Sequence, residues 1–389
     1  MSLDHLPAAA PTVDASEFAG RLDVLRSGMR RRRLGAVVLA SPESIYHLTG
    51  LDHLGYFAVT VLIVAAQGPA VLVARRMERH TQAAQTPGAV HVAYDEGRDP
   101  GPVVARALRR VVAAGARVGV EEQSMFLPPA VLRVARAGCA GVTWVDCSRL
   151  AAEVRSVKSP AELGLVRRAA AVSSQAMAAA IATAAAGVAE RDIAAAVHAA
   201  MIAAGGRPPG FVPLIRSTHR LAQEHVTWGD HVLSGGEGVF VELSGCVGRY
   251  HAPLSRIIHC GPPPSGAEAA AAAAEAGFAA ALDRLRPGVR GGEVYRAWED
   301  AVASATGIRQ RRHHCGYATG IGFSPSWVGG ARVRGLSAAG RGVVAAGMVF
   351  HVMSWVSLPH PAVRSDTVIV TADGCQVATT APSGLLISS

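Results

Sequence analysis

Residues 225–256 read HVTWGDHVLSGGEGVFVELSGCVGRYHAPLSR, and this stretch decides the fold of the C-terminal part of the chain. Two runs within and just beyond it, 238–245 and 250–261, are β-rich and separated by turn residues, so they predict consecutive strands. Side chains alternate between the two faces of a strand, so Glu242 points away from its neighbours Val241 and Leu243. The stretch therefore predicts a sheet with a carboxylate on one face.

Further strands and Ala-rich helices surround this stretch. The sequence predicts additional strands at 211–215, 349–355, 366–374 and 376–381. It predicts helices at 160–204 and 266–285, the first opened by Pro160 directly after Ser159. Strands joined by turns, together with long helices, indicate an antiparallel sheet with helices on one side, an α+β domain.

The N-terminal part has a different pattern. From residue 17 to 150, helical spacing alternates with short apolar runs at 36–40, 59–66, 70–74, 90–94 and 117–122. This alternation predicts a small α/β domain. We therefore expect a loose, disordered leader at 1–16, an N-terminal α/β domain at 17–153 and a C-terminal domain at 154–389.

Composition excludes several classes of protein. The formal charge is +9 over 389 residues, but the only dense basic run, 30–33, precedes an apolar strand and is read as a helix end, which argues against nucleic-acid binding. No run is long and apolar enough for a membrane span, and no signal-peptide pattern begins the chain. Six cysteines without CxxC spacing indicate reduced thiols. We expect a soluble, cytoplasmic protein.

Four segments in this order, 225–256, 313–323, 347–355 and 363–374, resemble the creatinase/prolidase/methionine-aminopeptidase family, whose fold is called pita-bread. The N-terminal part, with ASPESIYHLTGL at 40–51, resembles the creatinase-type domain of the same family. The motifs TW at 227–228, VELSGCVGRYHAPLSR, GYATGIGF and SDT are most similar to ectoine hydrolases, which open a cyclic amidine carboxylate. The resemblance implies a two-domain, creatinase-like hydrolase.

The family usually carries five metal ligands, namely Asp, Asp, His, Glu and Glu. The resemblance places these five positions at Glu242, Pro253, Tyr317, Met353 and Ser365. A Pro side chain cannot bind a metal, a thioether is soft, and neutral hydroxyls bind hard dications poorly. We therefore expect no metal and no other cofactor, and chemistry carried by organic acid–base or nucleophilic groups.

Two residues are the expected catalytic pair. His225 aligns with a proton-transferring histidine of the family, and the ordinary pKa of a histidine suits acid–base work near neutral pH. Glu242 is expected either to neutralise a cationic amidinium or guanidinium, or to attack its carbon as a nucleophile. A structural loop histidine and a surface carboxylate are the alternatives.

Other residues are expected to bind the substrate. Arg249 is a candidate partner for a substrate carboxylate, whereas Arg256 is expected to be structural. Tyr317 could orient the substrate or stabilise an oxyanion, or simply pack. The remaining candidates are Tyr250, His251, Phe211, Met353, Trp355 and Asp366.

Two further expectations concern neighbouring segments. His313, His314 and Cys315 follow one another, and because adjacent residues of a strand face opposite sides they are not expected to bind one metal ion together. The resemblance implies a homodimer, in which His53 or Tyr56 reaches the cleft of the partner.

The most favoured function is a metal-independent hydrolase of a non-peptide C–N bond in a small cyclic amidine or guanidine acid. One alternative is a biosynthetic enzyme that closes or rearranges a ring, favoured by unusual segments at 324–330 and 354–362. Another is a catalytically inactive binding scaffold, and a metallo-aminopeptidase is the least favoured. The true substrate and the direction of reaction stay open at this point.

Overall fold

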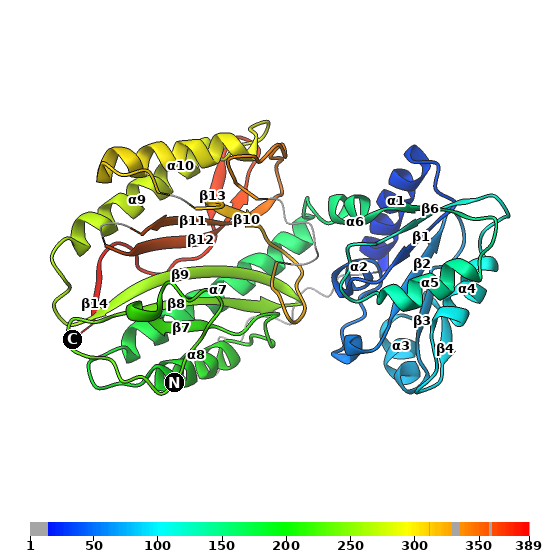
Figure 1. Ribbon diagram of the computed structural model, residues 1–389, viewed down its shortest axis with the longest axis horizontal. Helices are drawn as coiled ribbons and strands as arrows, with labels where there is room; N and C mark the ends of the chain where they lie inside the picture. Colours follow the sequence, from blue (N-terminus) through cyan, green and yellow to red (C-terminus); the bar gives the residue numbers. More distant parts are fainter. Residues whose placement is uncertain (1–14, 311, 329–334, 358–359, 389) are drawn as a thin grey trace. The chain divides into compact units, whose positions relative to one another are not determined.

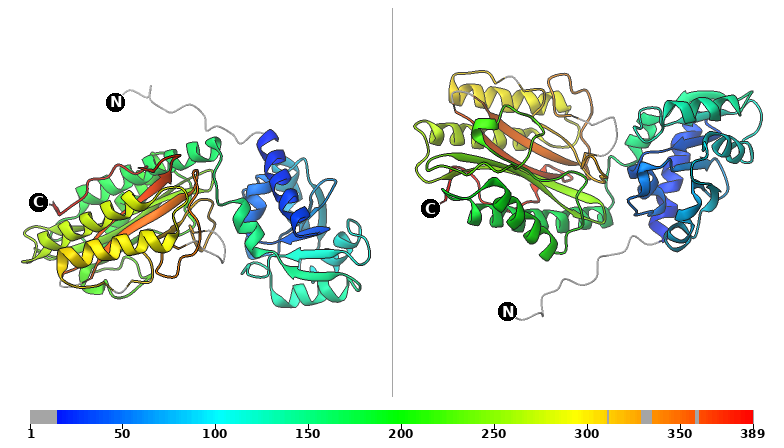
Figure 2. Two further views of the ribbon diagram at one scale, coloured as in Figure 1. Left: turned by 90° about the horizontal axis from the view of Figure 1, so that it is seen from above. Right: turned by 60° about the horizontal axis from the view of Figure 1, so that its bottom comes forward.

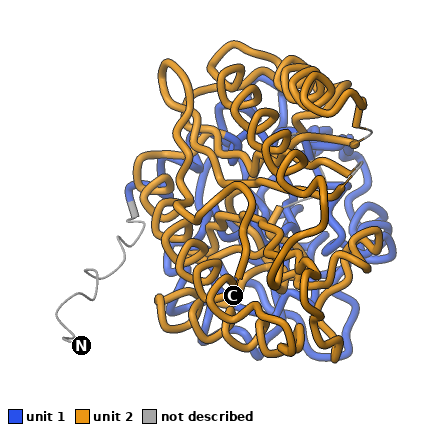
Figure 3. Tube along the Cα trace, turned by 90° about the vertical axis from the view of Figure 1, so that its left-hand side faces the viewer, with its two compact units in different colours: residues 1–156, 330–332 blue, residues 157–329, 333–389 orange. Residues whose placement is uncertain are grey.

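The chain divides into two compact units, coloured separately in Figure 3, of which the first ends at residue 156 and the second begins at residue 157. The computed structural model describes residues 15–310, 312–328, 335–357 and 360–388. The expected leader at 1–16 lies almost wholly outside the described residues, and the first helix already begins at Ala15. The expected boundary at residue 153 falls inside the last helix of the N-terminal unit.

The N-terminal unit is built on one six-stranded sheet, with strand order β4-β3-β2-β1-β5-β6. Its elements are α1 (Ala15–Arg31), β1 (Ala36–Leu39), α2 (Pro42–Thr49), η1 (Gly55–Phe57), β2 (Val61–Ala65), β3 (Val71–Arg75), η2 (Arg76–Glu78), α3 (Arg79–Gln85), β4 (Val90–Tyr94), α4 (Gly101–Arg109), β5 (Arg117–Val120), α5 (Pro129–Ala137), β6 (Thr143–Asp146) and α6 (Ser148–Val154). Strands β1 and β2 are buried along their whole length. The unit is the α/β domain that the sequence predicts.

The C-terminal unit contains an eight-stranded, largely antiparallel sheet with the path β10-β11-β12-β9-β8-β7. Its elements are α7 (Pro160–Thr183), α8 (Glu190–Ala203), β7 (Leu214–Ser217), η3 (Thr218–Arg220), β8 (Gly238–Val247), β9 (Tyr250–Cys260), α9 (Ala267–Arg284), α10 (Gly291–Thr306), β10 (Gly316–Ala318), β11 (Val349–Val356), β12 (Ala362–Val370), β13 (Cys375–Val377) and β14 (Leu386–Ser388). Helix α7 starts where the sequence predicts, because Ser159 and Glu162 form a reciprocal capping box and Pro160 occupies the first turn.

The helices of this unit cover one face of the sheet. Helix α7 contacts β8 and β9, and α9 contacts β11 and β12, while α8 and α10 pack beside α7 and α9 (Figures 1 and 2). Gly245 permits the close approach of α7, because a Cβ atom there would lie 2.3 Å from the carbonyl oxygen of Ala169. The opposite face of the sheet is therefore left for a site.

Strand register shows which residues share that free face. Glu242 pairs with Ser255, Ser255 with Ser365, and Ser365 with Met353, so these four side chains form one row across β8, β9, β12 and β11. In the next row Tyr317 pairs with His351. Paired residues of neighbouring strands project to the same side. All of them therefore lie on the face away from the helices.

Candidate active site

A cavity of about 560 Å³ opens on the free face of the C-terminal sheet. It is lined by Phe211, Leu214, His225, Glu242, His313, His314, Tyr317, Ser326, Trp327, Val328, Gly335 and Ser337. The expected catalytic pair, His225 and Glu242, therefore shares one cavity with the expected Tyr317 and Phe211. Such a concave, mostly apolar site with a few polar groups has the general form of a small-molecule site.

Among the described residues that line the cavity, Glu242 provides the only carboxyl group. It projects from the middle of β8, opposite Leu214 of β7, and is only 8% exposed. Burial raises the pKa of the Glu242 carboxyl to about 7, although Arg216 and Arg312 favour the charged form. This carboxyl therefore changes charge near neutral pH, and a cation bound in the cavity would favour its ionised state.

His225 lies in the loop between η3 and β8, and neighbouring residues fix its position. The Arg216 guanidinium donates to the carbonyl oxygen of Val226 at 3.3 Å, and the Thr227 hydroxyl donates to that of Pro213 at 2.6 Å. His225 itself has a φ of 59°, in the left-handed region that non-glycine residues rarely adopt. A strained backbone held by its surroundings is often found at functional sites.

Aromatic rings form one wall of the cavity. The ring of Phe211 lies edge-on to His225, with centroids 6.2 Å apart, and to Trp327, with centroids 5.3 Å apart. Trp327 belongs to the segment 324–330 whose sequence is unusual for the family, and residues 326–328 of that segment line the cavity. These three residues of the divergent segment are thus part of the site's surface.

A chain of hydrogen bonds lies beside Glu242, and its central residue, His351, was missed by the sequence analysis. His351 Nδ1 is 2.9 Å from the Tyr317 hydroxyl, and its Nε2 is 2.6 Å from the Ser365 hydroxyl. The chain continues from Ser365 to the Ser255 hydroxyl at 2.6 Å, and Trp327 Nε1 donates to the Tyr317 oxygen at 3.1 Å. The sequence could have revealed His351, because it lies two residues before Met353 and therefore projects from the same face of the strand.

Burial sets the charge state of this chain. It lowers the pKa of His351 to about 3, with further lowering by His314 and Arg256, so the imidazole is neutral at physiological pH. Burial and the neighbouring Glu242 raise the pKa of the Tyr317 phenol well above its usual value, so the phenol keeps its proton. His351 Nδ1 also lies 3.8 Å from Glu242 Oε1. The chain is therefore a set of neutral groups next to one titrating carboxyl.

Three residues of the β8–β9 hairpin were expected to bind substrate, but the structure places them outside the cavity lining. His251 is on the expected face, yet its Nε2 accepts from Gly210 N at 2.8 Å and its Nδ1 contacts the Arg249 carbonyl oxygen at 2.9 Å. Tyr250 is on the other face, where its hydroxyl donates to Glu162 of α7. The Arg249 guanidinium lies over the ring of Phe323, 4.5 Å from its centroid. These residues hold the hairpin in place.

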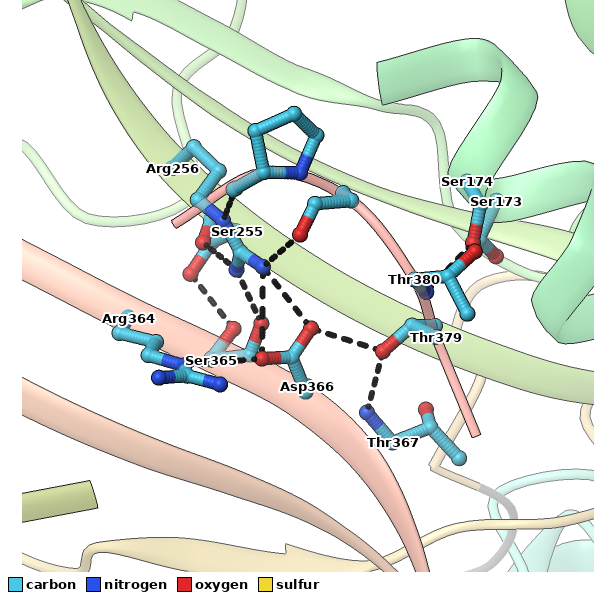
Figure 4. A network of polar contacts seen from close by, with 12 residues as sticks. Ser173, Ser174, Ser255, Arg256, Arg364, Ser365, Asp366, Thr367, Thr379 and Thr380 are labelled. Carbon is cyan, nitrogen blue, oxygen red and sulfur yellow. Dashed lines mark hydrogen bonds and ion pairs between the residues drawn. The ribbon is translucent and has the colours of Figure 1, made fainter. Parts of the chain in front are cut away.

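Asp366 also differs from its expected role. It follows Ser365 on β12, so strand alternation turns it away from the cavity face. Its carboxylate pairs with the buried Arg256 at 3.0 Å and accepts from the Thr379 hydroxyl at 2.8 Å (Figure 4). Arg256 additionally donates to the carbonyl oxygen of Ser365 at 2.7 Å. Asp366 and Arg256 thus form a structural ion pair.

Met353 and Trp355 project to the cavity face but belong to an apolar cluster with Phe240 and Leu214. The rings of Phe240 and Trp355 have centroids 5.2 Å apart. The residues of this apolar cluster form a packed layer beside the cavity. Neither Met353 nor Trp355 is among the residues that line it.

The histidine-rich segment before β10 divides between the two faces. His313 and His314 line the cavity, whereas Cys315 is packed in the core on the helix side. Among the described residues, no group of three or more His, Cys, Asp or Glu side chains is placed to hold a metal ion. All six cysteines lie among the described residues, none of them is in a disulfide, and five are buried.

Tyr56 belongs to the N-terminal unit and is buried there. Its hydroxyl donates to the Leu51 carbonyl oxygen at 3.2 Å, and its ring lies 4.3 Å from that of His53. A contribution of this segment to a partner's cavity, and the homodimer itself, stay predictions.

The family follows from comparison with known proteins. Residues 164–372 match the metallopeptidase family M24, and residues 21–157 match the creatinase/prolidase N-terminal domain. The chain belongs to the M24 family. This confirms the predicted resemblance and the predicted combination of a creatinase-like domain with a pita-bread domain. It also places the chain among hydrolases.

Individual proteins are similar to this one along nearly the whole chain. Ectoine hydrolase from Halomonas elongata is 25% identical, over 95% of this chain and 97% of that protein. Probable dipeptidase PepE from Mycobacterium bovis is 26% identical, over 96% of this chain and 97% of that protein. The structure of Xaa-Pro dipeptidase from Bacillus anthracis superimposes with a TM-score of 0.83 at 17% identity, covering 95% of this chain and 100% of that one. This last likeness shows the shared fold.

The M24 family name implies a metal site, but the residues of this chain do not fit a pair of hard divalent cations. Of the five family positions only Glu242 carries a carboxyl group. Met353 is packed in the apolar cluster, and the Ser365 hydroxyl is held between His351 and Ser255. At Pro253 only the backbone carbonyl oxygen is polar, and it accepts from the Thr367 hydroxyl at 2.8 Å. Hard dications require several oxygen ligands that this set does not supply.

No helix among the described residues is long and apolar enough to cross a membrane.

Proposed function

We propose that this M24 protein is a hydrolase of a non-peptide C–N bond in a small cyclic amidine or guanidine acid, and that it works without a metal ion. Ectoine is the best single candidate for the substrate. The similarity to ectoine hydrolase over nearly the whole chain supports this proposal. So does the mismatch between the residues at the five family positions and a metal pair.

One observation carries the proposal: a buried carboxyl, Glu242, shares a cavity with His225, and the described part of the lining contains no lysine or arginine. Burial raises the pKa of Glu242 to about 7, which means that ionisation of this carboxyl costs free energy. A cationic amidinium or guanidinium would offset this cost by pairing with the carboxylate. The cavity is thus suited to a small cation.

The chemistry follows from these two groups. Water adds to the amidinium carbon and gives a proton to His225, the C–N bond breaks, and His225 passes this proton to the departing nitrogen. Glu242 either stabilises the cation during this step or forms the first bond to the carbon. In the second case the C–N bond breaks to leave an imidate on Glu242, and water then displaces the Glu242 carboxylate to release the amide. Both routes consume one water and leave one amide and one amine.

A biosynthetic enzyme is the second candidate, because residues 326–328, from a segment whose sequence is unusual for the family, line the cavity. Ring closure is the reverse of the proposed reaction and uses the same groups. Mass spectrometry of ectoine and of its ring-opened acetylated diamino acid, each offered separately, distinguishes the two directions. Failure of both compounds to bind would favour an inactive scaffold or another ligand.

We expect the affinity for ectoine to rise as the pH increases through about 7, because the cation requires the ionised form of Glu242. Below this pH, binding should release a proton, so the calorimetric enthalpy should depend on the ionisation enthalpy of the buffer. Well above it, the buffer dependence should vanish. In Glu242→Gln both effects should be absent. Affinity that does not vary between about pH 6 and about pH 8 would contradict the role of Glu242.

A further inference from the structure

His351 has no part in the reaction as proposed above, yet it lies at the centre of the polar chain on the cavity face. It is fully buried, and each of its ring nitrogens has a hydroxyl partner. The Tyr317 oxygen and Glu242 Oε1 both lie within 3.8 Å of the same atom, His351 Nδ1. The imidazole therefore joins Tyr317, which lines the cavity, to the serine hydroxyls behind it, and it lies close to Glu242.

The protons carried by Trp327, Tyr317 and His351 limit the directions in which their hydrogen bonds can run. The Trp327 indole can only donate, so the Tyr317 oxygen accepts from it. The phenol has one proton of its own, and it can direct this proton either to His351 or into the cavity. Because the imidazole is neutral, one of its nitrogens carries a proton and the other accepts. The tautomer of His351 therefore decides whether Tyr317 is an acceptor or a donor towards the substrate.

We propose that His351 is a positioning residue that makes Tyr317 a hydrogen-bond acceptor in the cavity. In this arrangement Nε2–H donates to Ser365, Nδ1 accepts the Tyr317 proton, and a lone pair of the Tyr317 oxygen is left for the substrate beside Glu242. The inference rests on the proposed function, because an amidinium or guanidinium offers only N–H donors to its surroundings.

This arrangement determines which class of substrate is recognised. Glu242 and Tyr317 present two neighbouring acceptors, which match two N–H groups on one planar cation. A peptide or ester carbonyl would instead need donors aimed at its developing oxyanion. Tyr317 with its proton held by His351 cannot supply one. This set of hydrogen-bonded residues therefore selects a cation with at least two N–H donors. It discriminates against acyl groups that develop negative charge on oxygen.

The tautomer can be measured without any substrate. In the full-length protein labelled with ¹⁵N-histidine, we expect the His351 signals to show the Nε2–H tautomer and no titration between about pH 5 and about pH 9. The signals are assigned by their loss in His351→Asn. Tyr317→Phe should shift the Nδ1 resonance, because it removes the hydrogen bond. An Nδ1–H tautomer, a charged ring or an unchanged resonance in Tyr317→Phe would overturn the proposal.

Kinetics with ectoine as the probe give a second readout. Asn at position 351 can keep an acceptor near the place of Nδ1, whereas Gln places its amide nearer the Nε2 end and loses the contact with Tyr317. We expect kcat to fall about 10- to 100-fold in His351→Gln and in Tyr317→Phe, and much less in His351→Asn. The double variant His351→Gln/Tyr317→Phe should be no slower than Tyr317→Phe alone, because both remove the same interaction.

The control is His259→Asn. His259 is a buried histidine on β9, whereas His351 is on β11, and it does not line the cavity. It should leave kcat unchanged even if thermal stability falls. Multiplicative losses in the double variant, or near wild-type kcat in His351→Gln, would overturn the proposal. If the wild-type protein does not turn over ectoine, the proposed substrate fails, and the NMR measurement still decides the role of His351.

Discussion

Glu242→Gln should lower kcat for ring opening about 10²–10⁴-fold, because the substitution keeps the shape of the side chain but removes its charge and its nucleophilicity. The affinity for the cationic substrate should fall as well, since the substitution removes the carboxylate that pairs with the cation. The measurement is steady-state turnover of ectoine followed by mass spectrometry, together with calorimetric binding.

The matched control for Glu242→Gln is Glu275→Gln, which removes a carboxylate on the helix side of the same sheet, where Glu275 pairs with Arg364. It should leave kcat and binding unchanged. Wild-type turnover in Glu242→Gln would remove Glu242 from the mechanism.

The wild type and Glu242→Gln also provide a test of how burial affects the Glu242 carboxyl. The pKa of Glu242 is raised in the folded state, from 4.5 to about 7, so the folded state binds the proton more tightly than the unfolded state does. The free energy of unfolding of the wild type, relative to Glu242→Gln, should therefore be highest below about pH 4.5. It should fall by roughly 3 kcal/mol as the pH rises to about 7, and then level off. A difference that grows with pH would mean that Glu242 is stabilised as an anion.

His225→Ala should also lower kcat about 10²–10⁴-fold, because the departing nitrogen loses its proton donor. Binding of ectoine should change much less than in Glu242→Gln, since His225 carries no opposite charge for the cation. This difference between kcat and affinity separates a proton donor from a binding group.

His219→Ala is the matched control for His225→Ala. His219 lies in η3, near the start of the loop that carries His225, its side chain is 78% exposed, and it does not line the cavity. Equal effects of the two substitutions would indicate a loss of loop structure, and near wild-type turnover in His225→Ala would exclude the proposed proton transfer.

Much of the site could be predicted because strand alternation is a local rule. The period of two in residues 238–245 places Glu242 opposite to Val241 and Leu243, and the structure shows it facing the cavity. The same rule excludes Asp366, since an adjacent pair on a strand cannot face one side and Ser365 already does. It also indicates His351, which lies two residues before Met353 in an otherwise apolar run.

Other features depend on segments that are distant in sequence. His251 is on the cavity side of β9, but the segments that contain Gly210 and Gly320 cover it. Gly210 N donates a hydrogen bond to its ring, and its backbone N–H donates to the Gly320 carbonyl oxygen. Nothing in residues 250–256 reveals that cover. The position of the Arg249 side chain could not be predicted for the same reason, because its partner Phe323 comes from a different loop. Alternation predicts the face of a residue, whereas tertiary packing decides whether that face is open.

The most direct test of the central claim, catalysis on the M24 scaffold without metal, is to assay ectoine turnover while counting metal ions. Purified protein is treated with a chelator, its metal content is measured by mass spectrometry, and kcat is determined before and after addition of Mn²⁺, Co²⁺ or Zn²⁺. We expect undiminished kcat at metal contents far below one ion per chain, and no gain on addition of any of the three. Loss of activity on chelation, restored by one of these ions at a stoichiometric amount, would contradict the claim.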